Sequence, residues 1–404
     1  MSALNPLFEK SRHRPLSSTP WDEQKARNDI RSLVDTLFSA RLPNGLWPDE
    51  EDFPLSVYAG VAGIAWAIDT LFAREYLKQP YPKLCATQLI ANPERVNHPE
   101  FFTDFDVPIS HSFYLGGTGV YLQAWKETGE QSLLDQLDDL IGTNINHPWM
   151  ENLWGAPSTM LVASHLYCAT KEQRFAEHVR QGAAYLWTKR EPEPQSGCAM
   201  WNIELYGEQT WLTGAGHGYV GNVFPVLRSL EVLEEGVRTQ WLDSIAHTVT
   251  FTAQREHGLA NWRPSIGKGR KGRDDTLVQQ CHGSPGFVIS LGSLYGRGYD
   301  EFDSVLLEAG ELVWKAGPLD KYPGLCHGTP GNGYALLKLY QLTGDALWLQ
   351  RARQFAVSAM EQRDEYAKAG LETNYSLWDG DMGLALYLAD CIDANADFPT
   401  LDYF

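Results

Sequence analysis

Two segments of the chain share the tripeptide Cys-His-Gly. The first is Cys281-His282-Gly283, and the second is Cys326-His327-Gly328. Thiolate sulfur and imidazole nitrogen are the ligands that Zn²⁺ prefers in proteins. Four such ligands would close the tetrahedron and make the site structural, whereas three leave a position open for water or a substrate. The tripeptides therefore predict a metal site, provided that the fold brings them together.

The two histidines are not equivalent candidates. Neighbouring residues on a helix point about 100° apart, so two Cys-His pairs do not both chelate one ion easily. We favour Cys281, Cys326 and His327 as ligands of one zinc ion, with His282 behind them or facing a substrate. The alternative is a pair of buried cysteines and a pair of histidines that cap helices.

A third histidine occupies the same position relative to a glycine, in Gly216-His217-Gly218. If the three motifs lie on one rim, His217 is placed to act as a general acid or base. The alternative for His217 is a partly buried side chain bonded to a loop carbonyl.

These motifs belong to a pattern that occurs seven times along the chain. A short segment of small residues precedes an apolar stretch of helical length, as expected for a buried helix. Most copies carry a second glycine three residues after the first, on the same helix face, so that helix starts can approach closely; the third copy has Ser158 instead. The leading glycines are Gly60, Gly116, Gly155, Gly218, Gly283, Gly328 and Gly380.

Amphipathic segments lie between these copies, and their apolar residues recur at spacings of three and four residues. They span 24–40, 131–145, 173–187, 237–254, 301–316 and 345–363. The alternation predicts an all-α fold, an α/α toroid or double-layered helical barrel of seven helical hairpin repeats, in a single domain over 1–404. The N-termini of the inner helices would gather at one end, which is the expected site face.

Two stretches do not fit the repeat, and we expect them to be loop insertions. The first, 78–112, is rich in proline, and the second, 267–275, is basic and rich in glycine. The second loop is either a solvated surface loop or a lid that holds an anionic substrate.

Composition excludes several classes of function. The 404 residues carry 33 Lys and Arg against 51 Asp and Glu, a net charge of −18, which argues against nucleic acid and anionic membranes as partners. No apolar run reaches the roughly 18 residues of a membrane span. The N-terminus lacks a signal-peptide pattern, so we expect a cytoplasmic protein. The 6 cysteines are too sparse for a disulfide scaffold.

The segments GHGYVGN, QQCHGSPG and LCHGTPGNGYALL resemble the lanthionine synthetase C-like superfamily, and the repeats cover about 24–392. The resemblance implies an α/α toroid whose zinc ion is held by Cys281, Cys326 and His327, with a fourth position for water or a thiol. It also implies that His217 is the active-site acid or base.

Within that superfamily the chain is more similar to the eukaryotic-type, glutathione-binding members than to the lantibiotic cyclases. His282 stands where cyclases usually have Tyr, and Leu277 stands where they usually have Arg. Glu151 resembles the acidic residue of the eukaryotic type, and Lys321 resembles its substrate-site lysine.

The resemblance implies addition of a thiol, glutathione or a peptide cysteine, to dehydroalanine or dehydrobutyrine, which forms a thioether. Zinc would bind the sulfur as thiolate, His217 or His282 would stabilise the enolate, and His217 would supply the proton. Lys321, Arg270 and Arg273 are candidates for holding glutathione carboxylates or a phosphate leaving group, although for each arginine solvated surface charge is the favoured alternative.

Three other functions are weighed. The first is a lanthionine cyclase acting on a precursor peptide, and the second is a zinc-containing protein that binds glutathione or a peptide without turnover. The third is a glycoside hydrolase on the same fold, which would use paired carboxylates from Glu151, Asp379 and Asp381. That hydrolase would leave the Cys-His pairs unexplained.

Overall fold

The computed structural model describes residues 7–42, 47, 55–78, 81, 86–91, 111–205, 208–266 and 276–404. Within these ranges the chain is mostly helical with a few short strands, which confirms the helical class predicted above. The predicted loop at 267–275 lies outside the described residues. Of the predicted insertion at 78–112 only 78, 81, 86–91, 111 and 112 are described, and they include the short helix α3 (Ala86–Ile90).

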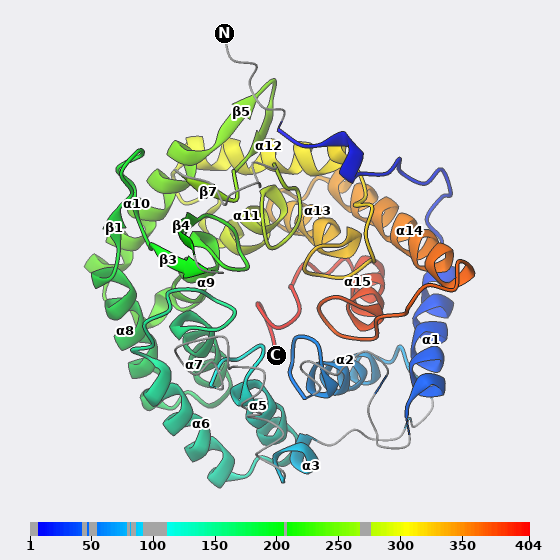
Figure 1. Cartoon of the computed structure of the whole chain (residues 1–404), viewed down its shortest axis with the longest axis horizontal. Coiled ribbons are helices and arrows are strands. Elements are labelled where there is room, and N and C mark those ends of the chain that lie inside the picture. The colour runs from blue at the N-terminus through cyan, green and yellow to red at the C-terminus, as the bar shows by residue number, and fades with distance from the viewer. Residues whose placement is uncertain are drawn as a thin grey trace.

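Inner helices surround a common centre, as Figure 1 shows, and each contacts the next until α15 meets α2 and closes the ring. Their residues are buried almost throughout, which matches the apolar stretches that follow the repeated glycines. The inner helices are α2 (Val61–Ala73), α5 (Gly117–Thr128), α7 (Ala156–Thr170), α9 (Tyr219–Arg228), α11 (Ser284–Leu291), α13 (Thr329–Thr343) and α15 (Asp381–Asp393).

A second set of helices lies outside the ring (Figure 1). Each of these helices buries one face only. In α8, for example, the buried positions recur every three to four residues from Phe175 to Leu186. They agree with the predicted amphipathic segments to within a few residues. The outer helices are α1 (Glu23–Ala40), α6 (Gln131–Asn144), α8 (Gln173–Thr188), α10 (Glu235–Thr252), α12 (Asp300–Ala316) and α14 (Ala346–Lys368).

The repeated glycines begin the inner helices. Each of the seven leading glycines is the N-cap of its helix. The second glycine of a repeat lies against the preceding loop: a Cβ on Gly331 would overlap the carbonyl oxygen of Leu325, and one on Gly286 that of Gln280. In the third repeat the Ser158 hydroxyl instead donates to the Gly155 carbonyl at 2.9 Å. The small residues therefore let each helix start fold back onto its own loop.

The loops that precede the inner helices are joined to one another by backbone hydrogen bonds. Each bond joins residues that stand two positions before a leading glycine, so the same register position is used in successive repeats. The bonds run from Gly216 N to Cys281 O (3.1 Å), Cys281 N to Cys326 O (3.1 Å), Cys326 N to Trp378 O (2.9 Å), Trp378 N to Tyr58 O (3.1 Å) and Tyr58 N to Tyr114 O (3.0 Å). We call this set the loop belt.

Short strands occupy the connections on either side of α9 and α10. The pairs are β1 (Glu191–Pro192) with β2 (Ala199–Met200), and β5 (Gln254–Glu256) with β6 (Leu259–Asn261); a three-stranded sheet joins β3 (Ile203–Leu205), β4 (Glu208–Leu212) and β7 (Ser265–Ile266). Single 3₁₀ turns are η1 (Lys10–Arg12), η3 (Leu230–Val232) and η4 (Gly292–Leu294).

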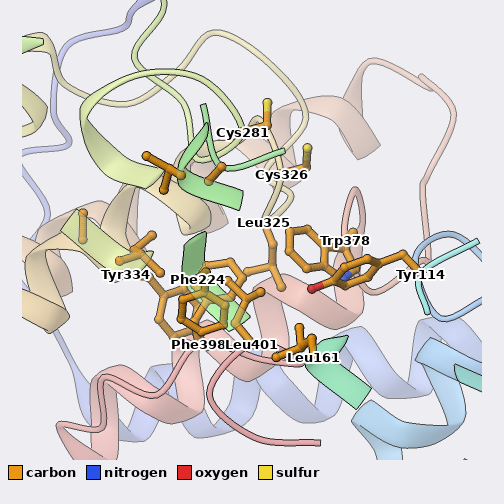
Figure 2. Packing of buried hydrophobic residues seen from close by; sticks show 14 of the residues in the cluster. Tyr114, Leu161, Phe224, Cys281, Leu325, Cys326, Tyr334, Trp378, Phe398 and Leu401 are labelled. Carbon is orange, nitrogen blue, oxygen red and sulfur yellow. The ribbon is translucent and has the colours of Figure 1, made fainter. Parts of the chain in front are cut away.

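The C-terminal segment, residues 394–404, enters the ring, and Figure 1 places its end near the centre. Phe398 and Leu401 are buried there among side chains of the inner helices (Figure 2). Two polar contacts anchor the segment: the His165 ring donates to the Thr400 carbonyl at 3.0 Å, and Lys338 pairs with Asp402 at 3.1 Å. This internal plug was not predicted from the sequence.

Among the described helices none combines the length and the apolar character that crossing a membrane requires.

Replacing Gly331 by alanine tests the contact at the helix starts. We expect Gly331→Ala to lower the free energy of unfolding by about 3 kcal/mol, because the added methyl meets a backbone oxygen that cannot move aside. The matched control is Gly236→Ala in α10, where no atom beyond the neighbouring backbone of the same helix lies within 4 Å of the added carbon and helix propensity favours alanine by up to about 1 kcal/mol. Urea unfolding measures both, and equal effects would contradict the prediction.

Candidate metal centre

The two Cys-His-Gly motifs bring three potential ligands together. One ligand atom each from Cys281, Cys326 and His327 lies within 4.8 Å of the other two. The loop belt explains this proximity, because the amide of Cys281 donates to the carbonyl of Cys326. Figure 2 shows both cysteine side chains at the same end of the core.

This donor set fits an open tetrahedral site. Ligand atoms around zinc lie about 3.5 Å from one another, so small side-chain adjustments would suffice to close on an ion. Cys281 and Cys326 are 7% and 9% exposed, whereas the side chain of His327 is 40% exposed. All three also line a cavity. The cluster can therefore hold a metal ion such as zinc and leave one side for a guest.

The two thiols differ in how readily they ionise. A hydrogen bond from the Cys326 thiol lowers the pKa of Cys281 well below its usual value, and His327 adds to the effect. The same hydrogen bond raises the pKa of Cys326 well above the usual value, and burial acts in the same direction. Because metal binding requires both sulfurs as thiolates, occupation of this site is coupled to proton release.

Asp379 lies behind the His327 ring. Its Oδ1 atom is 3.6 Å from Nδ1 of His327 and accepts a hydrogen bond from the Tyr58 hydroxyl at 3.3 Å. Burial raises the pKa of Asp379 above its ordinary value. A carboxylate beside a ligand imidazole fixes the orientation of the ring, so Asp379 and Tyr58 support His327.

His217 is paired with Glu151. The ring N–H of His217 donates to Glu151 Oε2 at 2.7 Å, and the backbone amide of Trp154 donates to the other carboxylate oxygen. Glu151 is only 1% exposed. Burial by itself would lower the pKa of His217, but the charge of Glu151 and its hydrogen bond outweigh burial and raise that pKa. The pair can therefore hold a protonated imidazole at the cavity wall.

The other predicted site residues divide into two groups. His282 and Lys321 both line the cavity, and the ring of His282 is 6.3 Å from that of His217 between centroids. Arg270 and Arg273 fall in 267–275, outside the described residues.

The cavity has a volume of about 530 Å³, within the range of pockets for small molecules. It reaches from the Cys-Cys-His cluster to Phe224 and Leu401, which lie at the opposite end in Figure 2. Its wall includes every residue that stands two positions before a leading glycine, namely Tyr58, Tyr114, Leu153, Gly216, Cys281, Cys326 and Trp378.

Several lining residues were missed by sequence reasoning. Tyr58, Tyr114 and Trp378 occupy the same register as the two cysteines, so aligning the seven repeats would have identified them. Gln279 and Asn152 carry no such signal, because they lie outside that register.

The carboxylates considered for a glycoside hydrolase do not line this cavity. Asp381 pairs with Arg363 at 3.1 Å and accepts from the Tyr322 hydroxyl at 2.7 Å. Glu151 is hydrogen-bonded to His217, and Asp379 lies 3.6 Å from the His327 ring. The arrangement of these acids is therefore that of supporting groups.

Residues 51–403 match the family model described as "Lanthionine synthetase C-like protein". The chain belongs to the lanthionine synthetase C-like family. This confirms the resemblance inferred from the motifs.

The curated proteins to which the chain is similar include two from eukaryotes. "Glutathione S-transferase LANCL1" of Danio rerio is 32% identical over 204 residues, which are 49% of this chain and 47% of that protein. "LanC-like protein GCL1" of Arabidopsis thaliana is 33% identical over 203 residues, 48% of this chain and 44% of that protein. The chain thus spans about half the length of the curated relatives it matches.

A solved structure titled "Nisin cyclase" has the same fold. The TM-score is 0.60 at 16% identity, over 91% of this chain and 94% of the other. At this identity the likeness establishes the architecture alone.

Removing one sulfur tests the metal centre of this lanthionine synthetase C-like protein. We expect zinc content to fall from about one ion per chain to about a tenth of that in Cys281→Ala, since only two ligands remain. Elemental analysis of dialysed protein measures it. Cys198→Ala, which removes a buried cysteine elsewhere, is the control. Stoichiometric zinc in Cys281→Ala would refute the ligand set.

Neutralising Glu151 tests the electrostatics of His217. In Glu151→Gln the negative charge that favours the imidazolium is gone while burial persists, so the pKa of His217 should move down past its ordinary value. An NMR titration of the histidine ring protons measures the change, with His13 in the N-terminal segment as the internal reference. An unchanged His217 curve would contradict the assignment.

Proposed function

We propose that this protein is a zinc-dependent enzyme that adds a thiol to dehydroalanine or dehydrobutyrine residues and forms a thioether. The observation that carries the proposal is an open set of two sulfurs and one imidazole on the wall of a cavity that also holds the His217–Glu151 pair. This combination offers a place for a guest sulfur and a proton donor in one enclosed volume.

Cys281, Cys326 and His327 would be the zinc ligands. A zinc ion bound there would hold the donor sulfur as a thiolate, which is the nucleophilic form. Near neutral pH a free thiol with a pKa of about 8.5 is only a few per cent ionised, so this ionisation is what the site must supply.

His282 and His217 would act on the dehydroamino acid, which accepts the sulfur. Addition of sulfur to Cβ pushes the double-bond electrons to the carbonyl oxygen, and His282 faces the cavity as a donor to that oxygen. His217 then gives its proton to Cα, and the proton lost by the thiol restores the imidazolium. Glu151 does not touch the reactants; it positions His217 and favours its charged form.

Glutathione is the proposed donor, with a peptide cysteine as the alternative. The relative from Danio rerio is named a glutathione S-transferase, and Lys321 on the cavity wall is suited to a glutathione carboxylate. Arg273 is proposed as a second contact to that anion. Because the chain matches only half of those relatives, the donor and the acceptor are both part of the proposal.

A lantibiotic-type cyclase is the second candidate, supported by the fold that the chain shares with nisin cyclase. Leu277 and His282 favour the first candidate, since both line the cavity at positions where cyclases carry other residues.

We also propose that the chain forms one domain, an α/α toroid of seven helical hairpin repeats over 1–404. The closure of the ring between α15 and α2 supports it. The cytoplasm stays the predicted compartment.

The reaction can be tested with glutathione and a short dehydroalanine peptide, with the thioether measured by mass spectrometry. We expect His217→Asn to lower kcat by about 10²- to 10⁴-fold, the usual contribution of a general acid. His178→Asn, in the outer helix α8, is the matched control and should react at the wild-type rate.

Chelated protein sets the uncatalysed background in the same assay. Thioether formation no faster than this background would remove the enzyme and leave the zinc-containing binding protein that takes glutathione without turnover. A wild-type rate in His217→Asn would remove only the assigned role of that histidine.

A further inference from the structure

Gln279 and Cys281 belong to one rigid turn. The amide of Gln279 donates to the His282 carbonyl at 3.0 Å, and the amide of His282 donates back to the Gln279 carbonyl at 3.1 Å. These reciprocal bonds close the turn around Cys281, while the loop belt fixes its other side. The backbone of Gln279 is therefore held at a set distance from the cysteine.

The Gln279 side chain contacts the cysteine sulfur directly. Its Nε2 atom donates to Sγ of Cys281 at 3.0 Å, and its Oε1 atom accepts from Nζ of Lys321 at 3.4 Å. An ammonium group can only donate, so the amide oxygen must face Lys321 and the amide NH₂ must face the sulfur. Lys321 thus selects the orientation of the amide in which the sulfur is an acceptor.

Burial and the charge of Lys321 strengthen the hydrogen bond between Gln279 and Cys281. Gln279 is 7% exposed and lines the cavity beside the cluster. A hydrogen bond to an ionised acceptor is stronger than one between neutral groups, and low polarity strengthens it further. The positive charge of Lys321 polarises the amide so that its N–H is a better donor to a thiolate.

We infer that Gln279 is a positioning residue of the metal centre, which donates an N–H···S hydrogen bond to the Cys281 thiolate and is held in that orientation by Lys321. The bond withdraws electron density from the ligand sulfur and keeps it aimed at the ion. The inference rests on the metal site proposed above, and it is independent of the thioether reaction. It also joins the lysine proposed to bind the donor's carboxylate to the ligand that holds the ion.

Cobalt substitution provides a readout of the sulfur itself. Co²⁺ bound by thiolates gives a near-ultraviolet charge-transfer band whose energy falls as the sulfur becomes richer in electrons. In Gln279→Met, which keeps the length of the side chain and removes the donor, the band should move to longer wavelength. Zinc affinity should also fall by about tenfold, as is usual when a partner of a metal ligand is lost.

The control is Gln280→Met, which makes the same substitution one residue along on the same cavity wall; its band should stay at the wild-type wavelength. Gln279→Glu is the second donor-free variant, and it preserves size and the contact to Lys321, so it serves if Gln279→Met does not fold. Its band should move in the same direction. A wild-type band in a folded donor-free variant would overturn the inference.

Lys321→Met tests whether the lysine acts on the sulfur through the Gln279 amide. The substitution is made in the wild-type protein and in Gln279→Met. It should shift the band when Gln279 is present and leave it unchanged in Gln279→Met, because the lysine acts through the amide. Equal shifts in both backgrounds would overturn the role of Lys321. A wild-type protein that binds Co²⁺ without any thiolate band would instead overturn the proposed metal site, which separates the two failures.

Discussion

The hydrogen bond from the Cys281 amide to the Cys326 carbonyl is the contact on which the site depends. It is one link of the loop belt, in which residues at the same position of successive repeats are joined through their backbones. Because the ring closes, side chains at that position converge on one cavity whatever their separation in sequence. Two neighbouring repeats that carry cysteine there must place two sulfurs together. A cluster of side chains that can hold a metal ion is thus a direct consequence of the repeat, and needs no special loop.

The loop belt determines where these side chains lie, and neighbouring carboxylates influence the pKa of two of the histidines. Glu151 raises the pKa of His217 and so favours its protonated form, and Asp379 lies behind His327. Glu151 is buried and Asp379 is partly buried, and each lies beside an imidazole at the cavity wall. Removal of Glu151 would leave burial as the largest influence on the pKa of His217. Two of the chain's many acidic residues therefore stand behind histidines. The cavity lining itself carries sulfurs, imidazoles and an ammonium group.

Sequence patterns predicted the parts of this architecture that are local or repeated. The glycines indicated the helix starts because backbone contact at Gly286 and Gly331 excludes a side chain. The paired tripeptides indicated the cluster because equivalent positions of neighbouring repeats lie at the same level in the ring. Contacts between residues at non-repeated positions could not be predicted from the sequence pattern. Tyr58 and Asp379 are 321 residues apart, and Gln279 reaches Lys321 only because two loops meet. The short strands were missed for a related reason, since strands of two to five residues leave no alternation to detect.

The C-terminal segment completes the cavity in a way that no repeat could. Seven helix starts packed around a ring leave a volume at the centre that their own small residues do not fill. Phe398 and Leu401 occupy part of it, and the His165 and Lys338 contacts keep them there. Leu401 also lines the cavity, so the depth of the space beneath the sulfurs is set by how far this segment enters. The volume offered to a guest is therefore decided jointly by the belt at one end and by the last residues of the chain at the other.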